Sequence, residues 1–124
     1  MARVLVVDDE CQMRELLRQA LERHGHVVDE AGDGKEALQH FAEQRPDIVL
    51  TDLVMPGKEG IETIQALRRQ SPTMPIIAMS GGGRVGPDEY LSLAGLLGAN
   101  RTFAKPFRLE EILTAVRELT AKTT

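Results

Sequence analysis

The sequence predicts an α/β fold, in which a parallel sheet of five strands carries helices on both faces. Short apolar segments that suit strands alternate along the chain with segments whose apolar residues have helical spacing. Five such strand–helix units favour a parallel sheet, because each helix provides the crossover to the next strand. A length of 124 residues suits one domain. We therefore expect residues 1–124 to form a single domain built on a doubly wound sheet.

The strand predictions rest on short apolar, often β-branched runs that lie between turn residues. The first, third and fourth runs are almost wholly apolar, as suits strands buried on both faces of a parallel sheet. The second and fifth runs are short and mixed, as suits sheet edges. With right-handed crossovers, this pattern predicts the strand order 2-1-3-4-5, the flavodoxin-like arrangement. The five predicted strands are residues 3–7, 27–28, 47–51, 76–79 and 101–104.

The helix predictions rest on apolar spacing and on signals at helix ends. The first helix carries apolar residues over 13–21, and Gly25 suits the left-handed residue that follows a helix. Asp33 and Glu36 have the spacing of a capping box at the start of the second helix. Gly60 is expected to open the third helix. Two more helices are expected at about residues 87–97 and at 107–119.

Composition and charge exclude several classes of protein. Apolar residues make up 42% of the chain, yet no apolar run approaches the roughly 20 residues of a membrane span. The N-terminus lacks the pattern of a signal peptide, and Cys11 is the only cysteine. A single cysteine fits a reducing compartment, so we expect a cytoplasmic protein. The net charge of −4 argues against a nucleic-acid surface. We expect direct binding neither to nucleic acid nor to a membrane.

Acidic residues follow two strands that should be neighbours in the sheet. Ligands of open parallel sheets bind beyond the carboxyl ends of the strands at the switch point, here between the first and third strands. Asp8 and Asp9 follow the first strand, and Asp52 follows the third, so three carboxylates should meet there. An acidic, all-oxygen site suits Mg²⁺. A carboxylate can also act as a nucleophile and form an aspartyl phosphate.

Two further strand ends add complementary groups. Ser80 follows the fourth strand, which should lie beside Asp52, and it offers a hydroxyl donor. Lys105 follows the fifth strand, two strands or roughly 9.6 Å from Asp52. Its long side chain can cover that distance and bring an ammonium group to a phosphoryl oxygen. The predicted crevice therefore holds acids for a metal, a nucleophile, a hydroxyl group and a cation.

Each of these residues also has a simpler interpretation. Asp9 and Gln12 have the spacing of a capping box. Asp52 and Ser80 could form hydrogen bonds within their own turns. Lys105 could be a solvated surface charge. What favours a common site is the placement of all these groups at the ends of four strands.

With these markers the sequence resembles the receiver domain of bacterial two-component response regulators over nearly its whole length. Singly the markers are modest, but their order and spacing together are highly specific. They are Asp8-Asp9 after the first strand, residues 52–57 with Gly60 after the third, Ser80 after the fourth, and Lys105-Pro106-Phe107 after the fifth.

The resemblance implies a site that accepts a phosphoryl group. Asp52 would be the phosphoacceptor. Mg²⁺ would be bound by Asp9, Asp52 and the backbone carbonyl of Val54, with Asp8 helping directly or through water. The phosphoryl donor would be a sensor histidine kinase or a histidine phosphotransfer protein, as in a phosphorelay.

The resemblance also implies a switch. Ser80 and Lys105 would hold the phosphoryl oxygens, and Phe103 would rotate inward as Ser80 moves toward the phosphoryl group. The bond between Lys105 and Pro106 is expected to be cis. The glycines at 81–83 and the length of the segment from Ser80 to Lys105 depart from the usual family pattern.

Such a receiver is a signalling switch rather than an enzyme, since it catalyses only its own phosphorylation and dephosphorylation. A downstream protein would bind the face formed by the helix at about residues 87–97, the strand at 101–104 and the last helix. We expect no output domain after that helix, so the chain would be a lone receiver or an excised piece.

Two other functions are compatible with parts of the pattern. A Mg²⁺-dependent phosphohydrolase could use Asp52 as a nucleophile toward small phosphate esters. Against it, the chain has no cap domain, and Val54 stands where such an enzyme would need an acid. A scaffold that works without phosphorylation could share the fold. The intact acids, Ser80 and Lys105 speak against that alternative.

Overall fold

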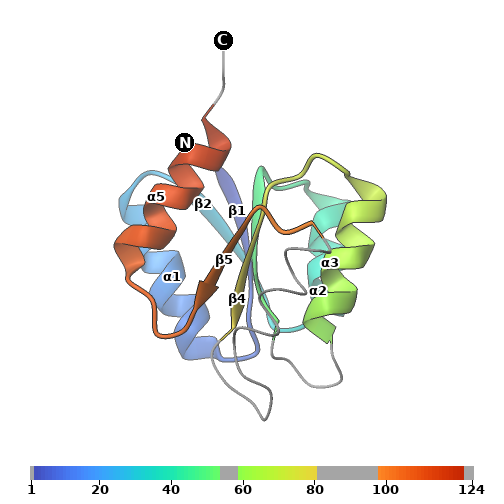
Figure 1. The fold of residues 1–124 in the computed structure, drawn as a ribbon, viewed down its shortest axis with the longest axis horizontal. Helices are drawn as coiled ribbons and strands as arrows, with labels where there is room; N and C mark the ends of the chain where they lie inside the picture. Colours follow the sequence, from blue (N-terminus) through green and yellow to red (C-terminus); the bar gives the residue numbers. More distant parts are fainter. Residues whose placement is uncertain (1, 54–58, 81–97, 122–124) are drawn as a thin grey trace.

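The sheet has the predicted architecture in the computed structural model, which describes residues 2–53, 59–80 and 98–121. Five parallel strands lie in the order β2-β1-β3-β4-β5 (Figure 1). The predicted fold class and strand order are therefore confirmed. The strands are β1 (Arg3–Val7), β2 (Val27–Ala31), β3 (Ile48–Asp52), β4 (Ile76–Ser80) and β5 (Arg101–Ala104).

Helices cover both faces of the sheet. In Figure 1, α1 and α5 lie on one side of the strands, and α2 and α3 lie on the other. Within the described residues, no helix is both long enough and apolar enough to cross a membrane. The helix predicted at about residues 87–97 and the glycine-rich loop before it lie outside the described residues. The helices are α1 (Cys11–Arg23), α2 (Gly34–Glu43), α3 (Glu59–Gln70) and α5 (Leu109–Thr120).

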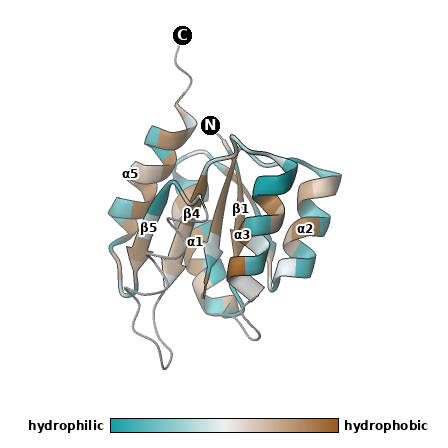
Figure 2. Ribbon diagram, turned by 45° about the vertical axis from the view of Figure 1, so that its right-hand side comes forward, coloured by the Kyte–Doolittle hydropathy of each residue, from teal (hydrophilic) through white to brown (hydrophobic). Residues whose placement is uncertain are grey.

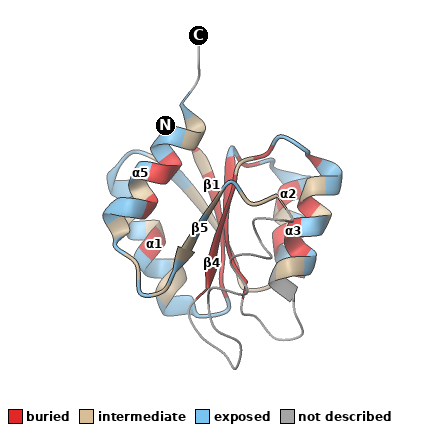
Figure 3. Ribbon diagram, viewed as in Figure 1, coloured by how far each residue is buried: buried red, intermediate tan, exposed pale blue. Residues whose placement is uncertain are grey.

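Two apolar clusters, one on each face, hold the layers together. Because side chains alternate along a strand, Leu5 and Val7 pack toward α2 and α3, whereas Val4 and Val6 pack toward α1 and α5. The central strands β3 and β4 are buried along their whole length, and the edge strands are only partly buried (Figure 3). Figure 2 shows the matching hydropathy, with mostly hydrophobic central strands and helices of mixed character. This burial pattern confirms the assignment of centre and edge strands.

The start of α2 follows the sequence prediction. Asp33 is the N-cap residue, and its Oδ1 accepts a hydrogen bond of 2.8 Å from the Glu36 backbone N–H. The Glu36 carboxylate in turn accepts a hydrogen bond of 2.8 Å from the Gly32 N–H, one residue before the cap. Gly25, after α1, has the expected positive φ, at 88°.

The start of α1 differs from one interpretation of the sequence. The helix begins at Cys11 with Glu10 as N-cap residue, and the Glu10 side chain forms no capping hydrogen bond. Instead, Asp8 Oδ1 accepts a hydrogen bond of 2.9 Å from the Glu10 backbone N–H, and the helix starts two residues beyond Asp9. The capping-box interpretation of Asp9 and Gln12 is therefore wrong.

Other element boundaries shift by a few residues. β2 reaches Ala31 because its ladder with β1 continues to the pair Val7–Ala31. α5 begins at Leu109, two residues later than expected, because Arg108 still has extended backbone angles. β3 and β4 include Asp52 and Ser80 as their last residues. Asp52 and Ser80 are thus part of the sheet itself.

Candidate functional site

The strand register brings the predicted residues to one edge of the sheet. Val7 pairs with Thr51, so Asp8 and Asp52 come next along two adjacent strands. On the other side of β3, Asp52 pairs with Met79, which precedes Ser80. Ser80 pairs with Ala104, and Lys105 follows directly. The carboxyl edge therefore carries acids in its centre, with a hydroxyl group and a cation toward β5.

Three carboxylates meet at this edge. Asp8, Asp9 and Asp52 each offer one oxygen, and these oxygens all lie within 4.8 Å of one another. Asp8 is fully buried and Asp52 is 3% exposed, whereas Asp9 is exposed. Close like charges repel one another unless a cation neutralises them. We call these three residues the acid cluster.

Lys105 supplies a cation to the acid cluster. Its Nζ lies 3.0 Å from Asp8 Oδ2, 3.5 Å from Asp52 Oδ2 and 3.9 Å from Glu10 Oε1. Burial acts to lower the pKa of Lys105, but the Asp8 hydrogen bond and the charges of the three acids outweigh it and raise the pKa above its usual value. The ammonium group is therefore held in its charged form. The interpretation of Lys105 as a solvated surface charge is wrong.

Ser80 is fully buried at the end of β4. Among the described residues, its Oγ has no hydrogen-bond partner. A buried hydroxyl group without a partner is costly, by about 1–3 kcal/mol. An oxygen placed at the carboxyl edge beside Asp52 would supply the missing bond. The lack of a partner for the Ser80 hydroxyl group among the described residues therefore favours a ligand at the carboxyl edge of the sheet.

Phe103 lies on β5 and is half-buried against the apolar cluster beneath α5. Its ring meets the ring of Phe107 edge to face, with centroids 6.5 Å apart. The bond between Lys105 and Pro106 is cis, as expected. Val54, the predicted backbone ligand, lies outside the described residues.

Comparison with protein families decides the identity of the domain. The family model of the response regulator receiver domain matches residues 4–117. The chain belongs to this family. The phosphoryl-accepting signalling role of the family fits a site that gathers three acids, a hydroxyl group and a lysine.

Curated relatives of this receiver domain are response regulators. The chain is 41% identical over 123 residues to the response regulator MprA of Mycolicibacterium vanbaalenii, which it matches over 98% of its own length and 52% of the relative. Identity with MprA of Mycobacterium leprae is 38% over 122 residues, with the same coverage. The chain thus spans about half the length of these relatives.

Solved structures with the same fold are also receivers or response regulators. The receiver domain of NtrX from Brucella abortus has a TM-score of 0.88 at 27% identity, over 97% of this chain and 99% of that chain. A putative response regulator from Chloroflexus aurantiacus has a TM-score of 0.87 at 29% identity, over 98% of both chains.

The residues at the edge of this receiver fit a divalent cation. Mg²⁺ prefers oxygen ligands and takes only a few carboxylates, and the acid cluster offers one oxygen from each of three residues. Asp9, the exposed member, leaves the cluster open to solvent. The donor set therefore agrees with the cation that the family typically uses.

Two contacts of the receiver site were not predicted from the sequence. Glu10 adds a fourth acid near Lys105. Arg14 donates a hydrogen bond of 2.6 Å from Nη1 to the backbone oxygen of Asp8. Arg14 is a basic residue in the first turn of the helix that follows the acids, which is a weak indication of a role near them. Nothing in its spacing indicated the backbone contact.

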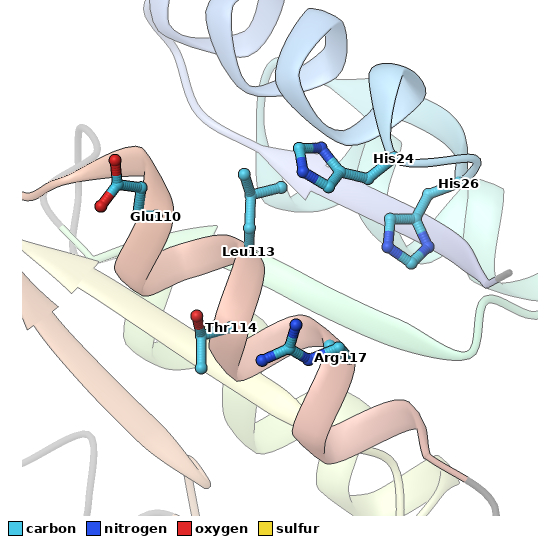
Figure 4. A pocket seen from close by; sticks show the side chains of 6 residues that line it. All are labelled: His24, His26, Glu110, Leu113, Thr114 and Arg117. Carbon is cyan, nitrogen blue, oxygen red and sulfur yellow. The ribbon is translucent and has the colours of Figure 1, made fainter.

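A cavity of about 400 Å³ lies elsewhere, between the end of α1 and one face of α5 (Figure 4). The acids precede the first residue of α1, whereas His24 and His26 follow the last. A helix of 13 residues is about 20 Å long at 1.5 Å per residue. The residues that line the cavity include neither the acid cluster nor Ser80 or Lys105, so it lends no support to the phosphohydrolase alternative. Its lining residues are His24, His26, Glu110, Leu113, Thr114 and Arg117.

Proposed function

We propose that this receiver domain accepts one phosphoryl group on Asp52, with Mg²⁺ held by Asp9 and Asp52. Asp8 and the backbone carbonyl of Val54 complete the proposed set of metal ligands. The observation that carries the proposal is the meeting of three carboxylates, within 4.8 Å of one another, with the ammonium group of Lys105. Such a set suits phosphoryl transfer, in which most of the catalysis is positioning and charge stabilisation.

The proposed transfer follows from the placement of these groups. An Asp52 oxygen attacks phosphorus and forms the new P–O bond, while the bond from phosphorus to the donor's histidine nitrogen breaks and its electron pair leaves with that nitrogen. Bound Mg²⁺ supplies positive charge against the phosphoryl oxygens. Lys105, already 3.5 Å from Asp52, donates a hydrogen bond to one of them.

Ser80 has a separate part in the proposal. Its buried hydroxyl group, which has no partner among the described residues, donates to another phosphoryl oxygen. The phosphoryl group thereby supplies a hydrogen-bond partner that the Ser80 hydroxyl group lacks within the described part of the chain. Phe103, on the neighbouring strand β5, would rotate inward as Ser80 moves toward the phosphoryl group. The change at Asp52 would then reach the surface of β5 and α5.

The proposed partners follow from the same role. A sensor histidine kinase or a histidine phosphotransfer protein gives the phosphoryl group. A downstream protein binds the face made by β5 and α5, together with the helix that the sequence predicts at about residues 87–97. The domain, over residues 1–124, acts in the cytoplasm and binds neither nucleic acid nor membrane directly. It catalyses only its own phosphorylation and dephosphorylation.

Phosphorylation by a small donor tests the proposal. Incubation with acetyl phosphate and Mg²⁺ should add one phosphoryl group to the wild type, as intact-protein mass spectrometry would show. Asp52→Asn should add none. Asp47→Asn is the matched control, because Asp47 is an exposed aspartate whose carboxylate accepts the Arg3 N–H, a role that asparagine can keep.

Two outcomes would contradict the proposal. Peptide mapping could place the label on a residue other than Asp52. Alternatively, the protein could turn over a chromogenic phosphate ester many times, which would favour the phosphohydrolase. A receiver is labelled once and then loses the phosphoryl group slowly.

A further inference from the structure

Arg14, in the first turn of α1, joins the acid cluster to β2. Its Nη1 donates a hydrogen bond of 2.6 Å to the backbone oxygen of Asp8. Its Nε donates a hydrogen bond of 3.2 Å to Glu30 Oε1 on β2. Hydrogen bonds from a charged donor are about twice as strong as neutral ones. The guanidinium group is thus fixed at two points. One of them is the backbone oxygen of Asp8, in the segment that carries the proposed metal ligands Asp8 and Asp9.

This contact, together with a second one, fixes the backbone on both sides of Asp9. The peptide group before Asp9 contains the Asp8 carbonyl that Arg14 holds. The peptide group after Asp9 contains the Glu10 N–H, which Asp8 Oδ1 accepts at 2.9 Å. Because a peptide group is planar, these two bonds restrict the orientation of the Asp9 α-carbon and its side chain.

Asp9 depends on such support more than its neighbours do. Asp8 is fully buried and Asp52 is 3% exposed, so packing and the sheet hold them. Asp9 is exposed and lies in the loop between β1 and α1. Nevertheless, one of its oxygens lies within 4.8 Å of oxygens from both other acids.

We propose that Arg14 is a positioning residue of the metal site, which holds Asp9 in place through the Asp8 carbonyl. This inference rests on the proposed function, because it assumes that Asp9 is a metal ligand. Groups that orient metal ligands typically change metal affinity by about 10–100-fold when they are removed. The hydrogen bonds of Arg14 to the Asp8 backbone oxygen and to Glu30 give it that position, since neither acceptor is one of the carboxylate oxygens of the acid cluster.

Arg18 provides a matched control. It donates a hydrogen bond of 2.7 Å from Nη1 to Glu30 Oε2, so both arginines contact the same glutamate from the same helix. Among the described residues, however, no hydrogen bond links Arg18 to Asp8. Replacing Arg18 therefore disturbs the ion pairs on β2 while the Asp8 carbonyl keeps its donor.

The test compares Mg²⁺ affinities of variants of the whole chain. Because the chain contains no tryptophan, isothermal titration calorimetry with Mg²⁺ is the suitable measurement. Arg14→Met keeps the aliphatic stem but has no donor, and it should weaken Mg²⁺ binding about 10-fold. Arg18→Met should change it by less than about twofold, because exposed ion pairs contribute little. Arg14→Lys restores one donor and should recover most of the affinity.

A kinetic readout separates positioning from a purely structural role. At saturating Mg²⁺, Arg14→Met should be phosphorylated by acetyl phosphate at nearly the wild-type rate, because Asp52 and Lys105 are unchanged. At low Mg²⁺ it should be slow. A domain that is merely less well folded would stay slow at both concentrations.

Several results would overturn the inference. Equal losses of affinity in Arg14→Met and Arg18→Met would assign the effect to the ion pairs of Glu30, and an unchanged affinity in Arg14→Met would remove Arg14 from the site. Should Arg14→Met fail to fold, Glu30→Leu carries the test. This variant keeps Arg14 but removes its hydrogen bond to Glu30, and it should weaken Mg²⁺ binding severalfold. An unchanged affinity contradicts the inference.

Asp9→Ala distinguishes this failure from a failure of the proposed function. If Asp9→Ala leaves Mg²⁺ binding unchanged, Asp9 is no ligand and the proposed metal site itself is wrong. If Asp9→Ala weakens binding while Arg14→Met does not, only the positioning role of Arg14 is wrong.

Discussion

Lys105 Nζ lies 3.0 Å from Asp8 Oδ2, so an ion pair joins the end of β5 to the end of β1 across the carboxyl edge of the sheet. The Asp8 side chain is fully buried and that of Lys105 is 13% exposed. The same ammonium group lies 3.5 Å from Asp52. In the unmodified protein, Lys105 therefore neutralises part of the charge that Mg²⁺ would also neutralise.

This relationship predicts opposite effects of Lys105→Met on metal binding and on phosphorylation. Mg²⁺ should bind severalfold more tightly, because a positive charge that repels it is gone. Phosphorylation by acetyl phosphate should become slower, because a phosphoryl oxygen loses its cationic partner. Calorimetry with Mg²⁺ and mass spectrometry over time measure the two effects. Lys35→Met, at an exposed lysine of α2, should change neither.

Stability should fall in the same variant when Mg²⁺ is absent. The buried Asp8 carboxylate loses its charged donor, which should lower the free energy of unfolding by about 1–3 kcal/mol. The pKa of Lys105 is raised in the folded protein, so its stabilising effect is fully present below its unfolded pKa of about 10.4 and is lost as pH rises through the folded pKa. Urea unfolding at pH 7 therefore captures the whole effect. Unchanged stability there would show that water replaces the lysine without cost.

Ser80→Ala should separate phosphorylation from signalling. Removing a buried hydroxyl group that has no partner among the described residues should leave the unfolding free energy equal or raise it by up to about 1 kcal/mol. Asp52 should still accept phosphate. The change in the NMR signals of Phe103 on phosphorylation should be lost, because the proposed link to β5 is missing.

Thr51→Val is the matched control for Ser80→Ala. Thr51 is also buried, but its hydroxyl group donates to the Asp52 backbone oxygen at 3.2 Å. Its loss should therefore lower stability by about 1 kcal/mol. If Ser80→Ala destabilises the unmodified protein as much as Thr51→Val does, the hydroxyl group of Ser80 already has a hydrogen-bond partner in solution. The phosphoryl group would then not be needed to supply one.

Most of the site could be predicted from sequence because parallel strands bring their carboxyl ends to one edge. Strand order alone places Asp8 beside Asp52, and Ser80 on the next strand. The distance that Lys105 must cover could also be predicted from the strand spacing. The acid nearest to Lys105 could not be predicted, because the choice between Asp8 and Asp52 depends on how the lysine side chain packs.

The helix starts show why some details cannot be predicted. Asp33 with Glu36 and Asp9 with Gln12 have the same spacing, yet only Asp33 caps its helix. At the start of α1, the Asp8 side chain takes the Glu10 N–H instead. The same spacing therefore occurs with and without a cap, so spacing alone does not decide whether the contact forms. The Arg14 contact with the Asp8 carbonyl has no characteristic spacing at all.

His26 predicts how the stability of the domain depends on pH. Its Nδ1 accepts the Ala2 backbone N–H at 3.1 Å at the start of β1. Burial, followed by the positive charges of the N-terminus and His24, lowers the pKa of His26 below its usual 6.5. Between the folded pKa and 6.5, the unfolded chain therefore binds more protons than the folded one. The free energy of unfolding should fall as pH decreases from about 6.5 through the folded pKa, and this contribution should be constant above and below that window.

His26→Asn should flatten that fall. Asparagine does not titrate, and its side-chain oxygen can still accept the Ala2 N–H. Urea unfolding followed by circular dichroism between pH 5 and 8 gives both curves, and their difference isolates His26 because the other groups are common to both proteins. Phosphorylation of Asp52 should be unchanged, since α1 separates His26 from the acid cluster by about 20 Å. Parallel curves for wild type and variant across this range would show that His26 has the same proton affinity in the folded and unfolded chain.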